Sequence, residues 1–397
     1  MTGVGLLSTA VALRAAALGF SDALTGAIMG AYFFGFVVGT QVGPKIVIRV
    51  GHVRAFSAFA AGAAAALLLH PLWLNAGAWM VLRFTTGVCV VGLYMVIESW
   101  LNERSTNAVR GRAFAIYQIV SLASLGLGQY LILVGGPTSA APFLIAGALF
   151  SIGLVPVVLT KVTEPAPISA VKLDLRRLWR ISPLGVAGTL VSALSNGSFF
   201  ALGPVFAQRM GLATAEISVF MSLLLFGGVL LQWPIGQLSD RWDRRTVILL
   251  VSIVGAALCG LTWLLGAENQ AVLFAVVFVY GGVTTSLYSL CVAHSNDYVP
   301  AQDAVATASG LLLVYGIGAT IGPPVAGVVM QSAGAAAFWL FLVAMFAALA
   351  LFILARMALR TEQPVQEPFV MLTRTSQSAL EALPALTTER SSSSQHR

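Results

Sequence analysis

Two charged side chains, Arg83 and Glu98, stand inside long apolar stretches of this sequence. A charge at the centre of a bilayer costs at least about 2.5 kcal/mol, so such residues usually face a partner or a water-filled cavity. Arg83 could bind an anion or take part in proton coupling, or it could hydrogen-bond backbone carbonyls of neighbouring helices. Glu98 could carry a proton, because burial favours the neutral carboxylic acid. It could instead form a salt bridge with Arg110 or Arg112 near the end of its helix.

A polar amide lies in the middle of another apolar stretch. Asn196 stands beside Gly197, and an amide without a hydrogen-bond partner is costly in hydrocarbon, so Asn196 is a further candidate for a polar site. The three cysteines have neither disulfide nor zinc-ligand spacing. Because we find no nucleophile–base pair, metal cluster or phosphate-binding loop, we expect no enzyme activity, no metal and no cofactor.

The composition places these residues in a membrane protein. Of the 397 residues, 58% are hydrophobic and only 9% are charged, whereas soluble domains carry roughly 25% charged residues. The mean hydropathy is +0.89, so most of the surface must face lipid. The formal net charge of +7 is not arranged as a basic stripe with interleaved aromatic residues, and we therefore expect no nucleic-acid partner.

Eleven apolar runs are long enough to span a bilayer, which takes about 20 residues. They lie at 24–48, 55–73, 76–100, 113–135, 140–160, 183–208, 216–238, 247–266, 270–292, 305–331 and 335–356. A shorter apolar run at 3–13 precedes them and has about half the required length. A misassigned start of the coding sequence, a natural half-helix and a cleaved signal peptide are the interpretations we weigh for it. The pattern predicts an all-α integral membrane protein of about twelve helices with a shortened first helix.

Basic residues gather in alternate loops. They are Lys45, Arg49, Arg54, Arg104, Arg110, Arg112, Lys161, Lys172, Arg176, Arg177, Arg180, Arg241, Arg244, Arg245, Arg356 and Arg360. The other loops hold little beyond Arg14 and Arg209. Because basic loops stay in the cytoplasm, the even-numbered spans end there, and the C-terminus is predicted to be cytoplasmic.

A long charged loop divides the chain into two halves with similar loop patterns. We expect an N-terminal helix bundle at 1–160, a cytoplasmic linker at 161–182, a C-terminal helix bundle at 183–358 and a disordered cytoplasmic tail at 359–397. The basic turn after the second span corresponds to the basic turn after the eighth. Internal duplication of this kind is typical of transporters that move two bundles around a central site.

One loop in the second half carries a specific pattern, G-Q-L-S-D-R-W-D-R-R at residues 236–245. It resembles the G-x-L-x-D-R-x-G-R-R signature of the major facilitator superfamily. The resemblance implies a cytoplasmic charged contact that must break when the bundles move. Its members here are Gly236, Asp240, Arg241, Arg244 and Arg245.

The corresponding loop of the first half is a degraded copy. It retains Arg49, Gly51 and Arg54 but has Pro44 at the glycine position and Ile48 at the acid position. A charged contact in the first half is therefore doubtful, and Asp240 is the better candidate.

Further segments support the resemblance. Arg83 to Gly87 is similar to the family's intramembrane R-x-x-x-G motif, and Glu103 with Arg110 is similar to its acid-to-arginine pair. The strings E-S-W-L-N-E at 98–103 and A-H-S-N-D at 293–297 resemble the YcaD-like branch of bacterial facilitators. The resemblance implies a fold of two six-helix bundles with a cavity between them. Candidate cavity residues are Tyr94, Asn196, Phe199, Phe200, Tyr280, Thr284 and Tyr288, with Gln118, Gln129, Gln232 and Tyr315 on supporting helices.

Together these features predict a secondary transporter that moves a small solute across a bacterial cytoplasmic membrane by alternating access. Protons are a candidate coupling ion, and passive facilitation stays open. Arg83 would engage the solute or the coupling ion, and Asp240 would hold one closed state. We expect a monomer embedded in the lipid bilayer. The alternative is a non-transporting membrane receptor or scaffold built on the same fold.

Overall fold

The regular structure of this chain is entirely helical in the residues that the computed structural model describes, which are 1–105, 107–160, 174–265, 269–300, 303–359, Phe369 and Thr375. Eleven of the helices are long and apolar enough to cross a membrane. The elements are α1 (Thr2–Ala17), α2 (Asp22–Val50), α3 (His52–Leu69), α4 (Ala76–Arg104), α5 (Asn107–Gly128), the 3₁₀ helix η1 (Gln129–Leu133), α6 (Ala141–Leu159), α7 (Leu175–Ile181), α8 (Pro183–Arg209), α9 (Thr214–Arg241), α10 (Arg244–Leu265), α11 (Gln270–Asn296), α12 (Ala304–Ala333) and α13 (Ala337–Leu359). The predicted all-α membrane architecture is confirmed.

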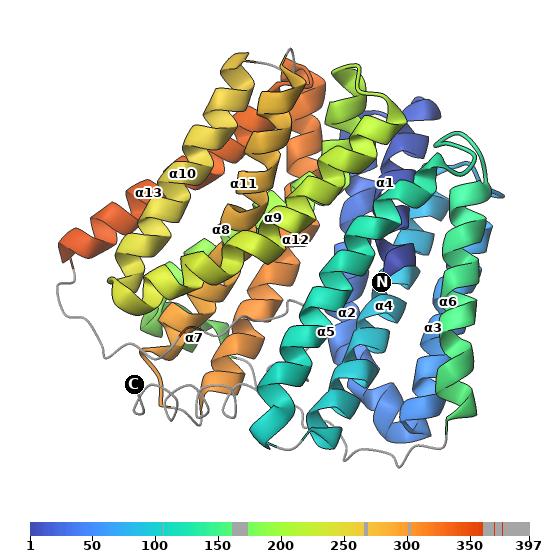
Figure 1. Cartoon of the computed structure of the whole chain (residues 1–397), viewed down its shortest axis with the longest axis horizontal. Helices are drawn as coiled ribbons and strands as arrows, with labels where there is room; N and C mark the ends of the chain where they lie inside the picture. Colours follow the sequence, from blue (N-terminus) through green and yellow to red (C-terminus); the bar gives the residue numbers. More distant parts are fainter. Residues whose placement is uncertain are drawn as a thin grey trace.

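The helices form two groups that follow the chain order. Figure 1 shows α1 to α6 on one side of the molecule and α8 to α13 on the other, with the short α7 below α8. Helix α1 is the predicted short opening helix and covers only part of the height of the bundle. Residues 161–173 of the predicted linker lie outside the described residues, and α7 forms the described part of that linker.

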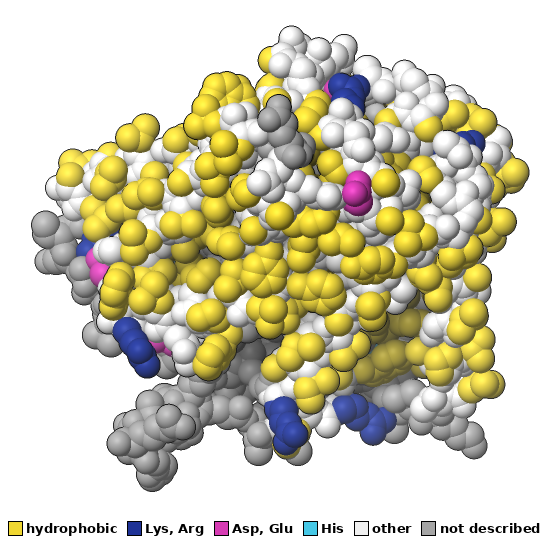
Figure 2. Space-filling model, turned by 45° about the horizontal axis from the view of Figure 1, so that its top comes forward, with side chains coloured by type: hydrophobic (Ala, Val, Ile, Leu, Met, Phe, Trp, Pro, Cys, Tyr) yellow, Lys and Arg dark blue, Asp and Glu magenta, His cyan; other side chains and the backbone are white. Residues whose placement is uncertain are grey.

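The two ends of the bundle differ in charge. We call the end that carries Arg49, Arg104 and Arg241 the basic end, and the end that carries Asp22 and Arg209 the opposite end. Hydrophobic side chains cover the middle of the face shown in Figure 2, and lysine and arginine side chains lie along its lower edge. This distribution suits a chain whose middle faces hydrocarbon and whose ends face water.

In the first half, α2 and α4 cross so closely that only glycine fits. A Cβ atom at Gly35 would overlap the carbonyl oxygen of Phe84, and a Cβ atom at Gly87 would overlap that of Tyr32. Small residues allow the two backbones to approach this closely. In lipid no hydrophobic effect drives helices together, so the close packing supplies the attraction between them. The crossing fixes the depth at which side chains of α2 and α4 meet.

The second half repeats this crossing with α9 and α11. Gly227 lies against the carbonyl of Phe278, and Gly281 lies against that of Leu224. Within each helix the spacing of these residues equals the spacing in the first half. The predicted internal duplication is therefore visible at the level of backbone contacts.

Helices of the two halves pack against one another near the opposite end. A Cβ at Gly26 of α2 would overlap the carbonyl of Pro323 in α12, and a Cβ at Gly327 would overlap the carbonyl of Asp22. Ser222 of α9 donates a hydrogen bond to the carbonyl of Gly126 in α5, with an O···O distance of 2.9 Å. The halves are therefore in tight backbone contact at this end.

An ion pair also joins the halves at the opposite end. Asp22, at the start of α2, binds Arg209, at the end of α8, with an N···O distance of 2.6 Å. The Asp22 side chain is buried, whereas the Arg209 side chain is 44% exposed. Because one partner reaches solvent, we expect a modest energy for this contact, on the order of 1 kcal/mol.

Most of the predicted tail lies outside the described residues, and its predicted disorder is not addressed by them. Phe369 and Thr375 are described, and both contact the helices. Phe369 is buried, and its ring occupies the space beside Gly236 of α9. These two residues of the predicted tail therefore lie against the helices, and Phe369 supplies an apolar contact with α9.

Candidate functional site

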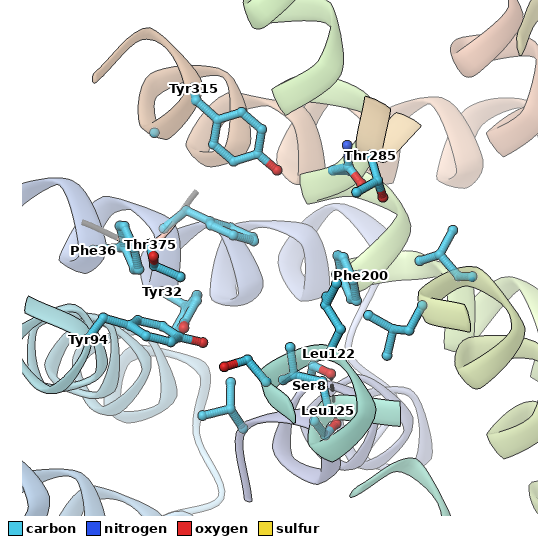
Figure 3. A pocket seen from close by; sticks show the side chains of 18 of the residues that line it. Ser8, Tyr32, Phe36, Tyr94, Leu122, Leu125, Phe200, Thr285, Tyr315 and Thr375 are labelled. Atoms are coloured by element: carbon cyan, nitrogen blue, oxygen red, sulfur yellow. Dashed lines mark hydrogen bonds between the residues drawn. The ribbon is translucent and has the colours of Figure 1, made fainter. Parts of the chain in front are cut away.

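A cavity of about 220 Å³ lies between the two halves. Figure 3 shows side chains from both halves around it, with Tyr94 and Tyr315 reaching toward the common space from different sides. Its lining includes Ser8, Tyr32, Phe33, Phe36, Arg83, Tyr94, Gln118, Ser121, Leu122, Leu125, Gln129, Asn196, Phe200, Leu224, Thr285, Leu312, Tyr315 and Thr375. A concave, mostly apolar space with a few polar groups is the usual form of a small-molecule site.

Among the described residues that line this cavity, Arg83 is the one with a charged side chain. It is only 3% exposed, and its Nε has no hydrogen-bond partner. The guanidinium carbon lies 4.6 Å from the centroid of the Tyr32 ring, a cation–π contact. Among the described residues no carboxylate forms a salt bridge with Arg83.

Glu98 lies on the same helix, nearer the basic end, and is fully buried. Its Oε1 accepts a hydrogen bond from the Tyr117 hydroxyl at 3.0 Å and another from the Thr375 hydroxyl. Arg110 instead donates to the carbonyl oxygen of Ser105. The predicted pairing of Arg110 with Glu98 or Glu103 is therefore not formed within the described residues.

The predicted cavity residues divide into two groups. Tyr94 and Asn196 line the cavity together with Phe200, Gln118, Gln129 and Tyr315. Asn196 also joins helices, because its Nδ2 donates to the carbonyls of Ser192 at 2.9 Å and Thr284 at 3.2 Å. These two hydrogen bonds give the Asn196 side-chain amide the partners that it would lack in hydrocarbon.

Five of the predicted residues do not line this cavity, and two of them are tyrosines. Tyr280 is fully buried in an aromatic cluster, with its ring centroid 5.3 Å from that of Phe199 and 5.9 Å from that of Trp339. Tyr288 packs edge-on against Tyr315, which lines the cavity, with 5.3 Å between the two ring centroids. A tyrosine facing the interior of one half serves packing rather than contact with a solute, so these two predictions are corrected. Phe199, Thr284 and Gln232 are likewise absent from the lining of this cavity.

The aromatic residues of α2 were not among the predicted cavity residues. Tyr32, Phe33 and Phe36 line the cavity, and Tyr32 is the ring that contacts Arg83. A signal was available, because Y-F-F-G-F at 32–36 is a dense aromatic run that includes Gly35. Such a run lies on a tightly packed helix at a depth similar to that of Arg83 on α4.

At the basic end, Arg244 is the centre of a buried ion pair. The Arg244 side chain is 1% exposed, and its Nη1 lies 2.6 Å from Asp297 at the end of α11. Asp240 is a weaker partner, with its carboxylate 3.8 Å from Arg244 Nη2. Arg245 instead pairs with Asp243 at 3.1 Å. Asp297 is therefore the main partner of the signature arginine, a role that the signature alone did not indicate.

Asp240 of the signature loop contacts the second half and the tail. Asp240 accepts a hydrogen bond from the backbone N–H of Phe369 at 2.5 Å, and Arg241 is exposed. Among the described residues, Asp240 makes no contact with the first half. A charged contact between the two bundles at Asp240 is thus not present in this conformation.

The first-half copy has no ion pair in the part of the chain that the structure describes. Arg49 and Arg54 are exposed, and Gly51 adopts a φ of 84° at the turn between α2 and α3. His52 follows Gly35 at the same spacing at which Arg244 follows Gly227, so His52 occupies the position equivalent to Arg244. Its Nε2 lies 3.1 Å from the Ser99 hydroxyl, so His52 hydrogen-bonds a hydroxyl group where Arg244 binds a carboxylate.

Comparison with known proteins identifies the family of this chain. Residues 1–226 and 185–391 match the Major Facilitator Superfamily. The chain belongs to this superfamily. It is similar to the uncharacterized MFS-type transporter YcaD of Escherichia coli K12 (strain DH10B), with 28% identity over 338 residues, 83% of this chain and 85% of the relative. The protein of the same name from Shigella flexneri matches with the same identity and coverage.

Solved transporter structures share the fold. The nucleoside transporter NupG superposes with a TM-score of 0.76 at 16% identity, covering 89% of this chain and 95% of NupG. A bacterial homolog of the human lysosomal transporter Spinster superposes with a TM-score of 0.67 at 16% identity, covering 98% and 95% of the two chains. At these identities the likeness concerns the fold alone. Family and helices together support a membrane transporter that spans a bacterial inner membrane several times.

Proposed function

We propose that this facilitator is a secondary transporter that carries a small solute across the cytoplasmic membrane by alternating access. The observation that carries the proposal is the central cavity, to which both halves contribute side chains. A site shared between two bundles can be exposed first to one side and then to the other when the bundles rock. Arg83 is the residue that we assign to solute binding.

The basic end is the cytoplasmic end in this proposal, because basic loops are retained in the cytoplasm. The conformation is then closed toward the outside, where Asp22 binds Arg209 and α2 packs on α12. Thr375, which contacts Glu98, lies at the cavity. The C-terminus is cytoplasmic under this assignment.

Proton coupling is the finer part of the proposal. Glu98 supplies a buried carboxylate on the helix that carries Arg83. It would release a proton when its contacts with Tyr117 and Thr375 open toward water and would bind one as it is buried again. A carboxylate that alternates between a buried and a wet environment can bind and release a proton in each cycle.

The test measures access to the cavity and needs no known solute. Cys89, Cys259 and Cys291 are replaced by alanine, and Leu122→Cys places one thiol in the cavity wall. Asp22→Asn breaks the ion pair at the opposite end. Because Arg209 is partly exposed, we expect about fivefold faster labelling by an impermeant thiol reagent from outside intact cells. Labelling in inverted vesicles should slow.

Arg14→Gln is the matched control, because Arg14 also lies near the opposite end but donates to the carbonyl of Thr138 within its own half. This variant should label like its parent. If Asp22→Asn changes labelling from neither side, the two bundles do not exchange access and the transporter mechanism proposed here is wrong. A fixed receptor or scaffold would give that result.

A further inference from the structure

The cavity holds a positive charge that no described carboxylate neutralises. Arg83 is 3% exposed, and the described residues offer it no carboxylate. Its Nε is buried without a hydrogen-bond acceptor. An isolated charge in a low-dielectric site is so costly that proteins normally pair it. Because the described residues supply no such partner, we expect it from a ligand.

The contact with Tyr32 leaves the guanidinium able to bind an anion. The Arg83 guanidinium carbon lies over the Tyr32 ring, 4.6 Å from the ring centroid. The N–H donors of a guanidinium lie in its plane and form a fork that matches a carboxylate or sulfonate. A guanidinium carries five such donors, so contact with one ring leaves donors for an anion.

The rest of the lining indicates the body of this anion. Rings from α2, α4, α8 and α12 surround the space, as Figure 3 shows for Tyr32, Phe36, Tyr94, Phe200 and Tyr315. The volume is about 220 Å³, whereas a cavity of about 150 Å³ accepts one benzene ring. The space therefore suits a single or fused ring with one anionic group.

The lining also disfavours other solutes. It contains no aspartate or glutamate among the described residues, so a cationic or zwitterionic solute would bring a positive charge without a partner. A small, strongly hydrated dianion such as phosphate would lose its water to a mostly aromatic wall and one arginine.

We propose that the transported solute is a monovalent organic anion with a planar, apolar body, and that Arg83 binds its anionic group. This inference rests on the transporter function proposed above. Tyr94 and Tyr315 supply ring contacts and hydroxyl groups, and Gln118 supplies an amide in the same lining.

The first experiment measures binding by thermal stabilisation of the purified full chain in detergent. The probes are naphthalenesulfonate, the neutral naphthalenesulfonamide, the cationic naphthylmethylamine and inorganic phosphate. We expect stabilisation by the sulfonate alone. Arg83→Gln should weaken its binding at least about tenfold, the usual loss for a charge-assisted hydrogen bond. Arg83→Lys should bind with an intermediate affinity because it keeps the charge but loses the fork.

A second measurement separates ligand binding from a structural role. Without ligand, Arg83→Met should melt at the same temperature as the parent or higher, because it removes an unpaired buried charge. If Arg83 instead served helix packing through hydrogen bonds, this variant would melt lower. A lower melting temperature would overturn the assignment even if the protein still folds.

Transport is then measured in proteoliposomes by counterflow of labelled naphthalenesulfonate, which stays ionised and does not cross lipid unaided. Saturable uptake that Arg83→Gln abolishes supports the inference. Equal or better binding of the neutral or cationic probe overturns it, and so does binding of none of the probes. The thiol-labelling experiment decides the transporter function separately. If the thiol labelling shows alternating access but the organic anion is not preferred, the transporter function stands and the proposed substrate class is wrong.

Discussion

The two halves share one helix crossing but place their charges at different depths. Gly35 and Gly87 pack α2 on α4 in the same way that Gly227 and Gly281 pack α9 on α11. Arg83 precedes Gly87 at the same spacing at which Val277 precedes Gly281, so the two residues are equivalent, and Val277 is buried. The first half thus supplies the charge within the membrane, while the second half is apolar at the equivalent depth.

At the basic end the asymmetry is reversed. The second half buries the ion pair of Arg244 with Asp297, whereas the first half has the hydrogen bond of His52 with Ser99 at the matching place. The close helix crossing is the same in both halves, because a side chain larger than that of glycine would overlap the partner backbone in either half. Side chains at the cavity and at the helix ends face no such steric rule, so each half can carry a different function.

The largest effect should come from the shared crossing. Gly87→Val and Gly281→Val would each drive a side chain into a backbone carbonyl of the partner helix, at a cost above about 4 kcal/mol. Both variants should lose folded, monodisperse protein in size-exclusion chromatography after extraction. Gly153→Val is the control, because a Cβ there meets no atom within 4 Å. Tolerance of one glycine variant but not the other would contradict the equivalence of the halves.

A smaller and unequal effect is expected from the two basic-end contacts. Asp297→Asn leaves Arg244 buried without its main ionic partner and should lower the free energy of unfolding by about 3 kcal/mol. Ser99→Ala removes one hydrogen bond with His52 and should cost about 1 kcal/mol. Denaturant unfolding in detergent measures both. Equal losses would show that the two halves do not differ at the basic end.

The smallest effect should come from the first-half loop. Arg54 is exposed and forms no salt bridge with a described residue. Arg54→Ala should therefore change the free energy of unfolding by less than about 0.5 kcal/mol. A loss comparable to that of Asp297→Asn would indicate an ionic contact of Arg54 and remove the asymmetry between the loops.

The candidate site was predictable in part. Arg83, Tyr94 and Asn196 could be placed at a cavity because charge and amide groups are costly in lipid. Tyr280 and Tyr288 could not be assigned correctly, since an aromatic residue on a buried helix has the same sequence pattern whether it faces a cavity or a core. Asp297 was missed as the partner of Arg244 because the two lie on different helices.

The membrane class, the helical fold and the family follow from the sequence alone. Long apolar runs must become helices in lipid, because each backbone group has to find its hydrogen bond within the segment. Which side of each helix meets the other half is visible only in the folded structure. There the Arg83 guanidinium lies over the Tyr32 ring, and no described carboxylate reaches that arginine. Rotation of a helix about its axis depends on packing against its neighbours, which a single apolar run does not specify.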